Sequence, residues 1–298
     1  MSLRVILAKM SVTTQIPTFE TLWPDVALIT LLHRYKAQLV YEALRASPAQ
    51  GDGVECGIFR GGITVMMAKV LQASGRRVRA YDSFEGLPSD RANVETEHYR
   101  PGHMIHSEGA VRATFEQHCV TNNIDIVSGW FADTMKGKCP VPISCVHIDC
   151  DMYYGVRDCL NHLYDSLLPG GIIVFDDYFD QGGGVEAAVN EHVAITKEVV
   201  HAGYGDQVFI MKGQTWSNLP TCHKWILDPQ KFIGIEFNGL FIDASIPSLN
   251  KEYQQDLLSG KLTSELPGGT LQNAERVAKR ILRQCEFHAA VIERSLRQ

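Results

Sequence analysis

Two pairs of carboxylates stand where apolar runs of the chain end. Asp149 and Asp151 close the run in CVHIDCD, and Asp176 and Asp177 close the run in GGIIVFDD. Carboxylates crowded in a partly dry cleft repel one another, which raises their pKa values unless a cation neutralises them. Their oxygens are the ligands that a hard divalent ion such as Mg²⁺ prefers. The residue types therefore point to an ion site beside which an acceptor oxygen can lose its proton.

The four acids can have two different roles, ion binding and general-base catalysis. Because ligands bind outside the carboxyl ends of the strands in a doubly wound sheet, Asp149, Asp176 and Asp177 can converge on one ion. Asp151 is then free to act as the general base, and it shares strand parity with Asp149 if that strand continues. The alternative is structural, with the acids capping helices and pairing with basic groups. We interpret His147, inside the apolar run, as a hydrogen-bonded core histidine.

A glycine-rich turn in GVECGIFRGG follows an earlier apolar run. Glycine allows the backbone to approach a ligand closely. The dinucleotide fingerprint GxGxxG is absent, because Phe59 stands where it needs glycine and the next glycine after Gly57 is Gly61. Asp82 ends the next predicted strand, where an acid can accept hydrogen bonds from both ribose hydroxyls of a nucleoside. Together these features favour a nucleoside-containing cofactor over a dinucleotide.

A third strand end carries the aromatic pair Trp130 and Phe131 in SGWFADT. The two rings could flank an adenine, although aromatic residues at such a position are more often part of the core. The three strand ends together, rather than the aromatic pair alone, indicate a site for a nucleoside-containing cofactor.

The elements that must position these residues alternate between β-rich runs and helix-like segments, which predicts a doubly wound α/β core. The last two predicted strands are separated only by GYG, which is too short for a crossover helix, so we expect an antiparallel hairpin at the sheet edge. The predicted strands lie near residues 52–56, 78–82, 124–128, 143–149, 172–176, 197–202 and 206–211.

The core is expected to span residues 50–212, with an additional segment on each side. In residues 1–49, DVALITLLHRYKAQLVYEALRAS has helical spacing up to Pro48 and suggests a lid or dimer helix, or else simple core packing. Residues 213–298 begin irregularly and end in a long amphipathic helix. Its apolar face comprises Val277, Ile281, Cys285, His288, Ile292 and Leu296.

Composition excludes several classes of protein. The chain has 298 residues, with 28 basic and 34 acidic side chains, so it lacks the basic surface of a nucleic-acid-binding protein. Its eight cysteines show no CxxC spacing, which argues against zinc and a disulfide framework and favours a reducing compartment. With no signal peptide and no apolar run long enough to span a bilayer, we expect a cytoplasmic protein.

Four segments together resemble the macrocin O-methyltransferase (TylF-type) family over roughly residues 50 to 180: VECGIFRGG, YDSFEGLP, SGWFADT and HIDCDMYYGVRDCLNHLYDSLLPGGIIVFDDY. The resemblance implies a Rossmann-like class I methyltransferase fold with a seven-stranded, mostly parallel sheet and an antiparallel edge hairpin. It also implies S-adenosylmethionine as cofactor, dependence on Mg²⁺, a homodimer, and methylation of hydroxyls on glycosylated natural products.

The same resemblance implies roles for individual residues. The metal ligands fall on Asp149, Asp176 and Asp177, and the base on Asp151, which takes the proton of a hydroxyl whose oxygen attacks the sulfonium methyl in line. The implied cofactor contacts are Glu55 and Gly57 to the methionine part, Asp82 and Ser83 to the ribose, and Gly129 and Trp130 near the adenine.

Some segments depart from the family. Residues 213–298 have no counterpart, and YFDQGGGVEAAV is richer in glycine than expected, so both could shape a different acceptor pocket. The polar loop between Gly86 and Gly109 is a candidate lid. We interpret its His103 and His106 as surface histidines.

Three other functions remain open. Catechol-type or phenol-type O-methyltransferases resemble a pattern with Asp-Asn and a lysine base, whereas Asp177 and Asp151 occupy those places here. Metal-dependent phosphate-ester hydrolysis accounts for the acids but leaves Asp82 and the glycine turn without a role. A methyltransferase-like cyclase or ligand-binding subunit is the third.

Overall fold

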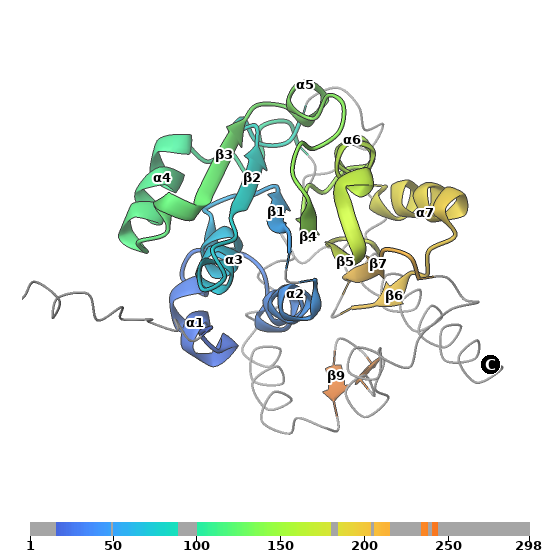
Figure 1. Ribbon diagram of the computed structural model, residues 1–298, viewed down its shortest axis with the longest axis horizontal. Helices are drawn as coiled ribbons and strands as arrows, with labels where there is room; N and C mark the ends of the chain where they lie inside the picture. Colours follow the sequence, from blue (N-terminus) through green and yellow to red (C-terminus); the bar gives the residue numbers. More distant parts are fainter. Residues whose placement is uncertain are drawn as a thin grey trace, which may run out of the picture.

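The computed structural model describes residues 16–48, 50–88, 100–179, 184–203, 206–214, 234–237 and 240–243, the last two ranges as backbone. The strands of its central sheet are β1 (Asp52–Cys56), β2 (Val78–Asp82), β3 (Ile124–Ser128), β4 (Ile143–Ile148), β5 (Leu167–Phe175), β6 (His201–Ala202) and β7 (Val208–Met211). They form a seven-stranded sheet in the order β3-β2-β1-β4-β5-β7-β6 (Figure 1).

The first five strands are parallel, whereas β7 runs antiparallel to both β5 and β6. The predicted fold class and edge hairpin are therefore confirmed. Strand order reverses between β1 and β4, which is where doubly wound sheets bind ligands. In this register Glu55 of β1 lies beside His147 of β4.

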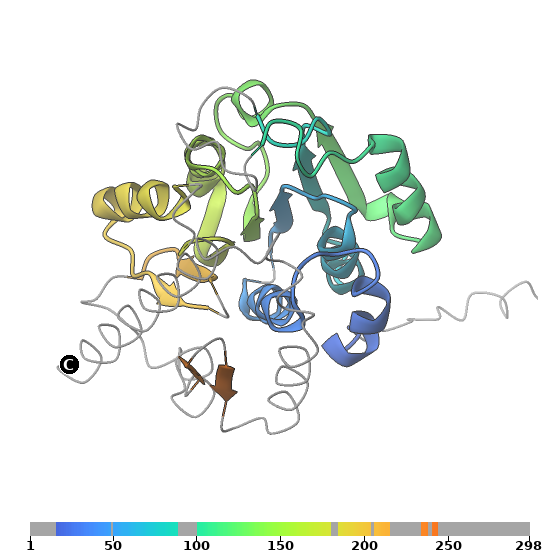
Figure 2. The same cartoon turned by 180° about the vertical axis from the view of Figure 1, so that it is seen from behind.

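Helices cover both faces of the sheet. They are α1 (Phe19–Val26), α2 (Arg34–Ala46), α3 (Gly62–Gln72), α4 (Glu108–Gln117), α5 (Phe131–Thr134), α6 (Tyr153–Leu163) and α7 (Val185–Thr196), with short 3₁₀ turns η1 (Thr121–Asn123) and η2 (Tyr164–Ser166). Figure 2 shows helices on both sides of the sheet. The buried side chains of α1 to α4 belong to the core on one face and those of α5 to α7 to the core on the other.

The single helix expected within residues 25–47 is wrong, because α1 and α2 are separate helices. Thr18 caps α1 by accepting a hydrogen bond from the Thr21 backbone, so this helix begins earlier than the apolar pattern indicated. Between the helices, Leu28 and Leu31 are 78% and 53% exposed rather than buried. The predicted end near Pro48 is confirmed, since α2 ends at Ala46.

The buried residues of α2 belong to the core, which agrees with the core-packing alternative. They are Tyr35, Ala37, Leu39, Val40, Ala43 and Leu44. A lid or dimer role for residues 1–49 stays a prediction.

Strand bounds differ from the predictions mainly at the carboxyl-terminal side of the core. β5 begins at Leu167 rather than near residue 172, so the strand includes Pro169 and Gly170. The two strands of the hairpin are shorter than predicted. Further on, β8 (Gly234–Phe237) and β9 (Leu240–Asp243) form a separate antiparallel pair within an interval expected to be irregular.

Most of the described cysteines are buried. The six described cysteines are free thiols, and Cys119 is the exposed one. Among the described helices, none has both the length and the hydrophobicity required to cross a bilayer. The predicted amphipathic helix within residues 270–296, with its apolar face, lies outside the described residues, as do Cys222 and Cys285.

Candidate active site

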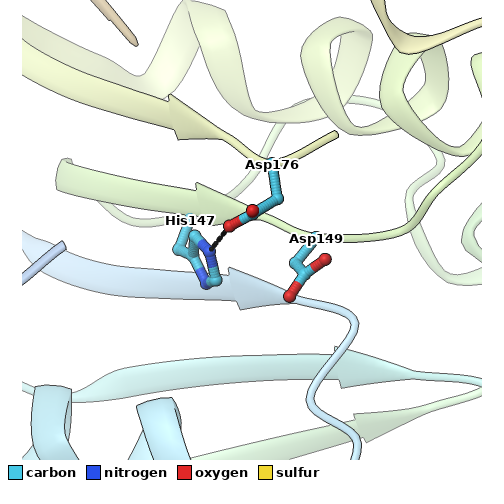
Figure 3. Close-up of side chains that lie close together, drawn as sticks. All are labelled: His147, Asp149 and Asp176. Atoms are coloured by element: carbon cyan, nitrogen blue, oxygen red, sulfur yellow. Dashed lines mark hydrogen bonds and ion pairs between the residues drawn. The ribbon is translucent and has the colours of Figure 1, made fainter. Parts of the chain in front are cut away.

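The predicted acids gather at the carboxyl ends of β4 and β5. Asp176 is buried, while Asp149, Asp151 and Asp177 are half-buried. Ligand atoms of His147, Asp149 and Asp176 lie within 4.8 Å of one another (Figure 3). The structure therefore brings carboxylates from neighbouring strands to one edge of the sheet.

A second group of three acids shares Asp176 with the first. Ligand atoms of Asp176, Asp177 and Asp206 also lie within 4.8 Å of one another. Asp149 and Asp177 thus belong to different groups that meet at Asp176. We call the carboxylates of Asp149, Asp176, Asp177 and Asp206, which lie at this edge of the sheet, the acid edge. It extends from β4 to the residues just before β7.

A buried polar row connects the acid edge with the glycine turn. His147 is fully buried, with Nδ1 3.3 Å from Glu55 Oε1 and Nε2 3.1 Å from Asp176 Oδ2. On the far side of Glu55, the Thr64 hydroxyl of α3 donates to Oε2. His147 is therefore a partnered core histidine, as expected, but its partners are two of the predicted site acids.

The pKa values of the residues in this row are strongly shifted from their ordinary values. Burial alone would lower the pKa of His147, but its hydrogen bonds with Asp176 and Glu55 outweigh burial and raise that pKa to about 10. Burial raises the pKa of the Glu55 carboxyl, although hydrogen bonds from His147 and Thr64 oppose the shift. His147 is therefore a cation at neutral pH between two acids.

The three predicted metal ligands differ in the direction in which their pKa values are shifted. Burial raises the pKa of Asp149 well above its ordinary value, and the charge of Asp176 adds to the shift. Burial likewise raises the pKa of Asp177, and Asp206 adds to it. Burial opposes ionisation of Asp176 too, but Lys36 and His147 hold its pKa well below the ordinary range.

Lys36 of α2 reaches into the acid edge. Its Nζ lies 2.6 Å from Asp176 Oδ1, 2.5 Å from Asp206 Oδ1 and 3.9 Å from Asp177 Oδ1. The second oxygen of Asp176 accepts a hydrogen bond from Gln207 Nε2 at 2.8 Å. Lys36, Asp206 and Gln207 were not predicted from the sequence. Only the fold brings the start of α2 and the residues just before β7 close to the end of β5.

Asp151 lies in a turn rather than in a strand. β4 ends at Ile148, so the parity argument for Asp149 and Asp151 does not apply. Asp151 adopts a left-handed backbone conformation with φ 59°, and the following Met152 N–H donates to the Cys150 carbonyl at 2.6 Å. Its charge nevertheless contributes to the raised pKa values of Asp149 and Asp177, so it belongs to the same cluster.

The predicted cofactor residues lie at the ends of β1 and β2. Gly57 and Gly61 both have left-handed backbone angles, as the close turn requires. The Asp82 carboxylate accepts hydrogen bonds from the backbone N–H groups of Ile58 and Phe84, each at 2.8 Å. Asp82 therefore joins the two turns to each other.

Glu55 and Ser83 also have internal partners. Glu55 is 2% exposed and uses both oxygens within the polar row. The Ser83 hydroxyl accepts from the Glu85 N–H at 3.1 Å and donates to the Gly86 carbonyl at 3.3 Å. Both side chains therefore have partners within the chain.

The third strand end carries Gly129 and Trp130 beside the second. The Gly129 N–H donates to the Asp82 carbonyl at 2.9 Å, and the half-buried Trp130 is the N-cap of α5. In the candidate lid, whose residues 89–99 lie outside the described chain, the His106 ring centroid is 5.6 Å from that of Phe59. His103 and His106 are half-buried, and His106 thus contacts the glycine turn.

Two curated relatives are similar to part of the chain. The 8-demethyl-8-(2,3-dimethoxy-alpha-L-rhamnosyl)-tetracenomycin-C 4'-O-methyltransferase of Streptomyces olivaceus is 35% identical over 168 residues, which are 52% of this chain and 64% of the relative. The demethyldecarbamoylnovobiocin O-methyltransferase of Streptomyces niveus is 31% identical over 140 residues, 43% of this chain and 53% of the relative. The chain therefore spans less than two thirds of the length of either relative.

A solved structure and a family profile agree with these similarities. The O-methyltransferase NovP superposes with a TM-score of 0.57 at 25% identity, over 62% of this chain and 83% of NovP. The profile described as macrocin-O-methyltransferase (TylF) matches residues 19–201, from the first helix to the edge hairpin. Because this match extends over more than half of the sequence, the chain belongs to the macrocin-O-methyltransferase (TylF) family.

Proposed function

We propose that this chain is an S-adenosylmethionine-dependent, Mg²⁺-dependent O-methyltransferase acting on a hydroxyl of a small natural product. One observation carries the proposal: Asp149, Asp151, Asp176 and Asp177 gather at adjoining strand ends, next to the glycine turn after β1. Family membership supplies the reaction class, and the acids supply a place for an ion and a base.

The donor set fits a hard divalent ion. Asp149, Asp176 and Asp177 offer carboxylate oxygens only, and both ring nitrogens of His147 already have carboxylate partners. Burial, with added repulsion from neighbouring carboxylates, raises the pKa values of Asp149 and Asp177, and a bound cation would favour their charged forms. Bound there, Mg²⁺ supplies Lewis acidity that lowers the pKa of an acceptor hydroxyl.

The remaining steps belong to the chain's own residues. Asp149, Asp176 and Asp177 would hold the ion. Asp151 would take the proton of the acceptor hydroxyl as the hydroxyl oxygen attacks the methyl group of S-adenosylmethionine, whose sulfur–methyl bond breaks to release S-adenosylhomocysteine. Glu55 and Gly57 would border the methionine part of the cofactor, Asp82 and Ser83 the ribose, and Gly129 and Trp130 the adenine. Holding cofactor and acceptor in line removes much of the entropic cost of the reaction.

A sugar or other vicinal diol is the acceptor class that fits best. The name of the Streptomyces olivaceus relative describes methylation of a 4'-hydroxyl on a rhamnosyl group. An oxygen neighbouring the reacting hydroxyl would allow the acceptor to reach the ion through two atoms. The partner is therefore a small hydroxylated molecule, and the homodimer and the cytoplasmic location remain part of the proposal.

Calorimetry with S-adenosylmethionine, followed by methyl-transfer assays with and without Mg²⁺, tests this function. Candidate glycosides and catechols serve as acceptors, and methylated products are detected by mass spectrometry. The proposal expects cofactor binding, and methylation of a glycoside that stops when Mg²⁺ is chelated. Turnover that is indifferent to chelation would remove the ion from the mechanism, whereas failure to bind the cofactor would refute methyl transfer altogether.

A further inference from the structure

Lys36 stands in a place that helix preferences do not favour. It lies in the first turn of α2, which begins at Arg34 and has no acidic residue in that turn. The positive end of the helix dipole repels a cation there. Where a local preference is broken, tertiary contacts of the residue commonly supply the reason. Those contacts are carboxylates of the acid edge.

Both oxygens of Asp176 are already engaged. Oδ2 faces His147 Nε2 at 3.1 Å and Gln207 Nε2 at 2.8 Å. Oδ1 faces the Lys36 ammonium at 2.6 Å. Oδ2 already has two partners and Oδ1 has one, so an ion that uses Asp176 either displaces a buried partner from Oδ2 or binds Oδ1 in competition with the Lys36 ammonium.

Lys36 is the partner that can move. Its side chain is 21% exposed, whereas those of His147 and Asp176 are 0% and 2% exposed. A lysine side chain is long and flexible, with its charge on a single atom that can turn toward another acceptor. Asp206 Oδ1 lies 2.5 Å from the same ammonium, so Lys36 can leave Asp176 without becoming a buried unpaired charge.

We propose that Lys36 is a tethered cation that holds Asp176 Oδ1 in the ion-free protein and yields this atom when a divalent ion binds, while Asp206 retains the displaced ammonium. This inference rests on the proposed function, because it takes Asp176 as a ligand of the ion. Lys36 and Asp206 are then positioning residues that set the affinity of the site for the ion. In the ion-free protein, Lys36 holds the carboxylate of Asp176, at the end of β5, close to that of Asp206, just before β7.

The test compares Lys36→Met with the parent chain. Mg²⁺ affinity is measured by calorimetry, and Mn²⁺ affinity by electron paramagnetic resonance, both on the full chain. Removing the competing charge should tighten binding of either ion by about tenfold or more. Lys69→Met is the matched control, since Lys69 is similarly exposed at 26% but pairs with Asp25 at 3.7 Å instead. The control should leave ion affinity unchanged.

A double-mutant cycle tests the role of Asp206. Asp206→Asn should weaken ion binding in the parent, because Lys36 loses its alternative partner and stays on Asp176. In the Lys36→Met background most of this effect should disappear. An equally large effect in both backgrounds would mean that Asp206 acts on the ion directly. It would overturn the proposal that the Lys36 ammonium moves from Asp176 to Asp206 when the ion binds.

The outcomes separate this inference from the proposed function. If the parent binds Mg²⁺ and Lys36→Met binds it no more tightly, Lys36 does not compete and the inference falls while the ion site stands. If neither protein binds Mg²⁺ or Mn²⁺, both the inference and the proposed ion site fall. Should Lys36→Met lack the circular-dichroism spectrum of the parent, Lys36→Gln takes its place with the same expected tightening.

Discussion

Gly57 lies directly against the backbone of Asp149. A Cβ built on Gly57 would come within 1.9 Å of the Asp149 carbonyl oxygen, and Gly57 has a left-handed φ of +82°. The Asp149 N–H in turn donates to the Cys56 carbonyl at 2.9 Å. The turn proposed to hold the cofactor and the acid proposed to hold the ion are therefore in contact, which ties the two halves of the site together.

Replacing Gly57 by alanine should damage both halves. The left-handed backbone costs a non-glycine residue on the order of 1–3 kcal/mol, and the clash with Asp149 adds to this. We expect a lower free energy of unfolding in urea and weaker binding of both S-adenosylmethionine and Mg²⁺. Gly75→Ala is the control, because Gly75 has a φ of +70° with nothing within 4 Å of its Cβ position. Equal losses in the two variants would mean that the contact with Asp149 has no special importance.

Asp151→Asn should separate binding from chemistry. General base catalysis contributes roughly 10²–10⁴-fold, so the rate of methyl transfer should fall by about that factor. Affinity for S-adenosylmethionine should stay within about twofold, since Asp151 is not among the residues proposed to contact the cofactor. Single-turnover rates and calorimetry measure the two quantities. Asp133→Asn, at an exposed acid paired with Lys136, is the control. Unaltered turnover in Asp151→Asn would refute the base assignment.

His147 should make the stability of the ion-free protein depend on pH. The pKa of this histidine rises from 6.5 to about 10 on folding, so the folded state binds its proton more tightly than the unfolded state. The stabilisation is fully present below pH 6.5 and is lost as the pH rises through about 10.

The difference in unfolding free energy between the parent and His147→Gln isolates this effect. Urea titrations in chelator across that pH interval should give a difference that is largest at the acidic end and shrinks toward the alkaline end. A difference that stays constant with pH would show that His147 is not a protonated link between Glu55 and Asp176.

Divalent ions should stabilise the fold. An ion that binds only the folded state adds about 2.7 kcal/mol to the free energy of unfolding at a hundredfold excess over its dissociation constant. Thermal unfolding with Mg²⁺ and with chelator measures this shift. Because Asp149 and Asp177 have raised pKa values, the shift should weaken as acidic pH protonates them. A double variant, Asp149→Asn with Asp177→Asn, should lose the response to Mg²⁺, and a persistent response would place the ion elsewhere.

The sheet and its strand ends were predictable because the signals were local. β1, β2 and β3 match their predicted bounds, since each is a short apolar run followed by a turn with glycine or aspartate. The fourth and fifth strands of a doubly wound sheet are neighbours, so Asp149 and Asp176 were expected at one edge, and the pairing of β4 with β5 places them there. The same strand-end argument suggested three acids for an ion and Asp151 as the base, and the resemblance to a known family implied the same roles.

The polar network around those acids was not predictable in the same way. His147 was expected to have partners, but only the pairing of β1, β4 and β5 shows that they are Glu55 and Asp176. The contact between Lys36 and Asp206 joins two segments far apart in the chain, and no local signal connects them. Lys36 itself gave no sequence signal, because the single helix expected within residues 25–47 put it mid-helix, whereas the structure puts it in the first turn of α2.

A crystal structure grown with Mn²⁺ and S-adenosylhomocysteine tests the central claim most directly, because anomalous scattering locates the manganese without ambiguity. The account predicts one peak coordinated by Asp149, Asp176 and Asp177, with the Lys36 ammonium moved off Asp176 and onto Asp206. A structure with cofactor bound, no manganese peak at these carboxylates and Lys36 still on Asp176 would contradict it.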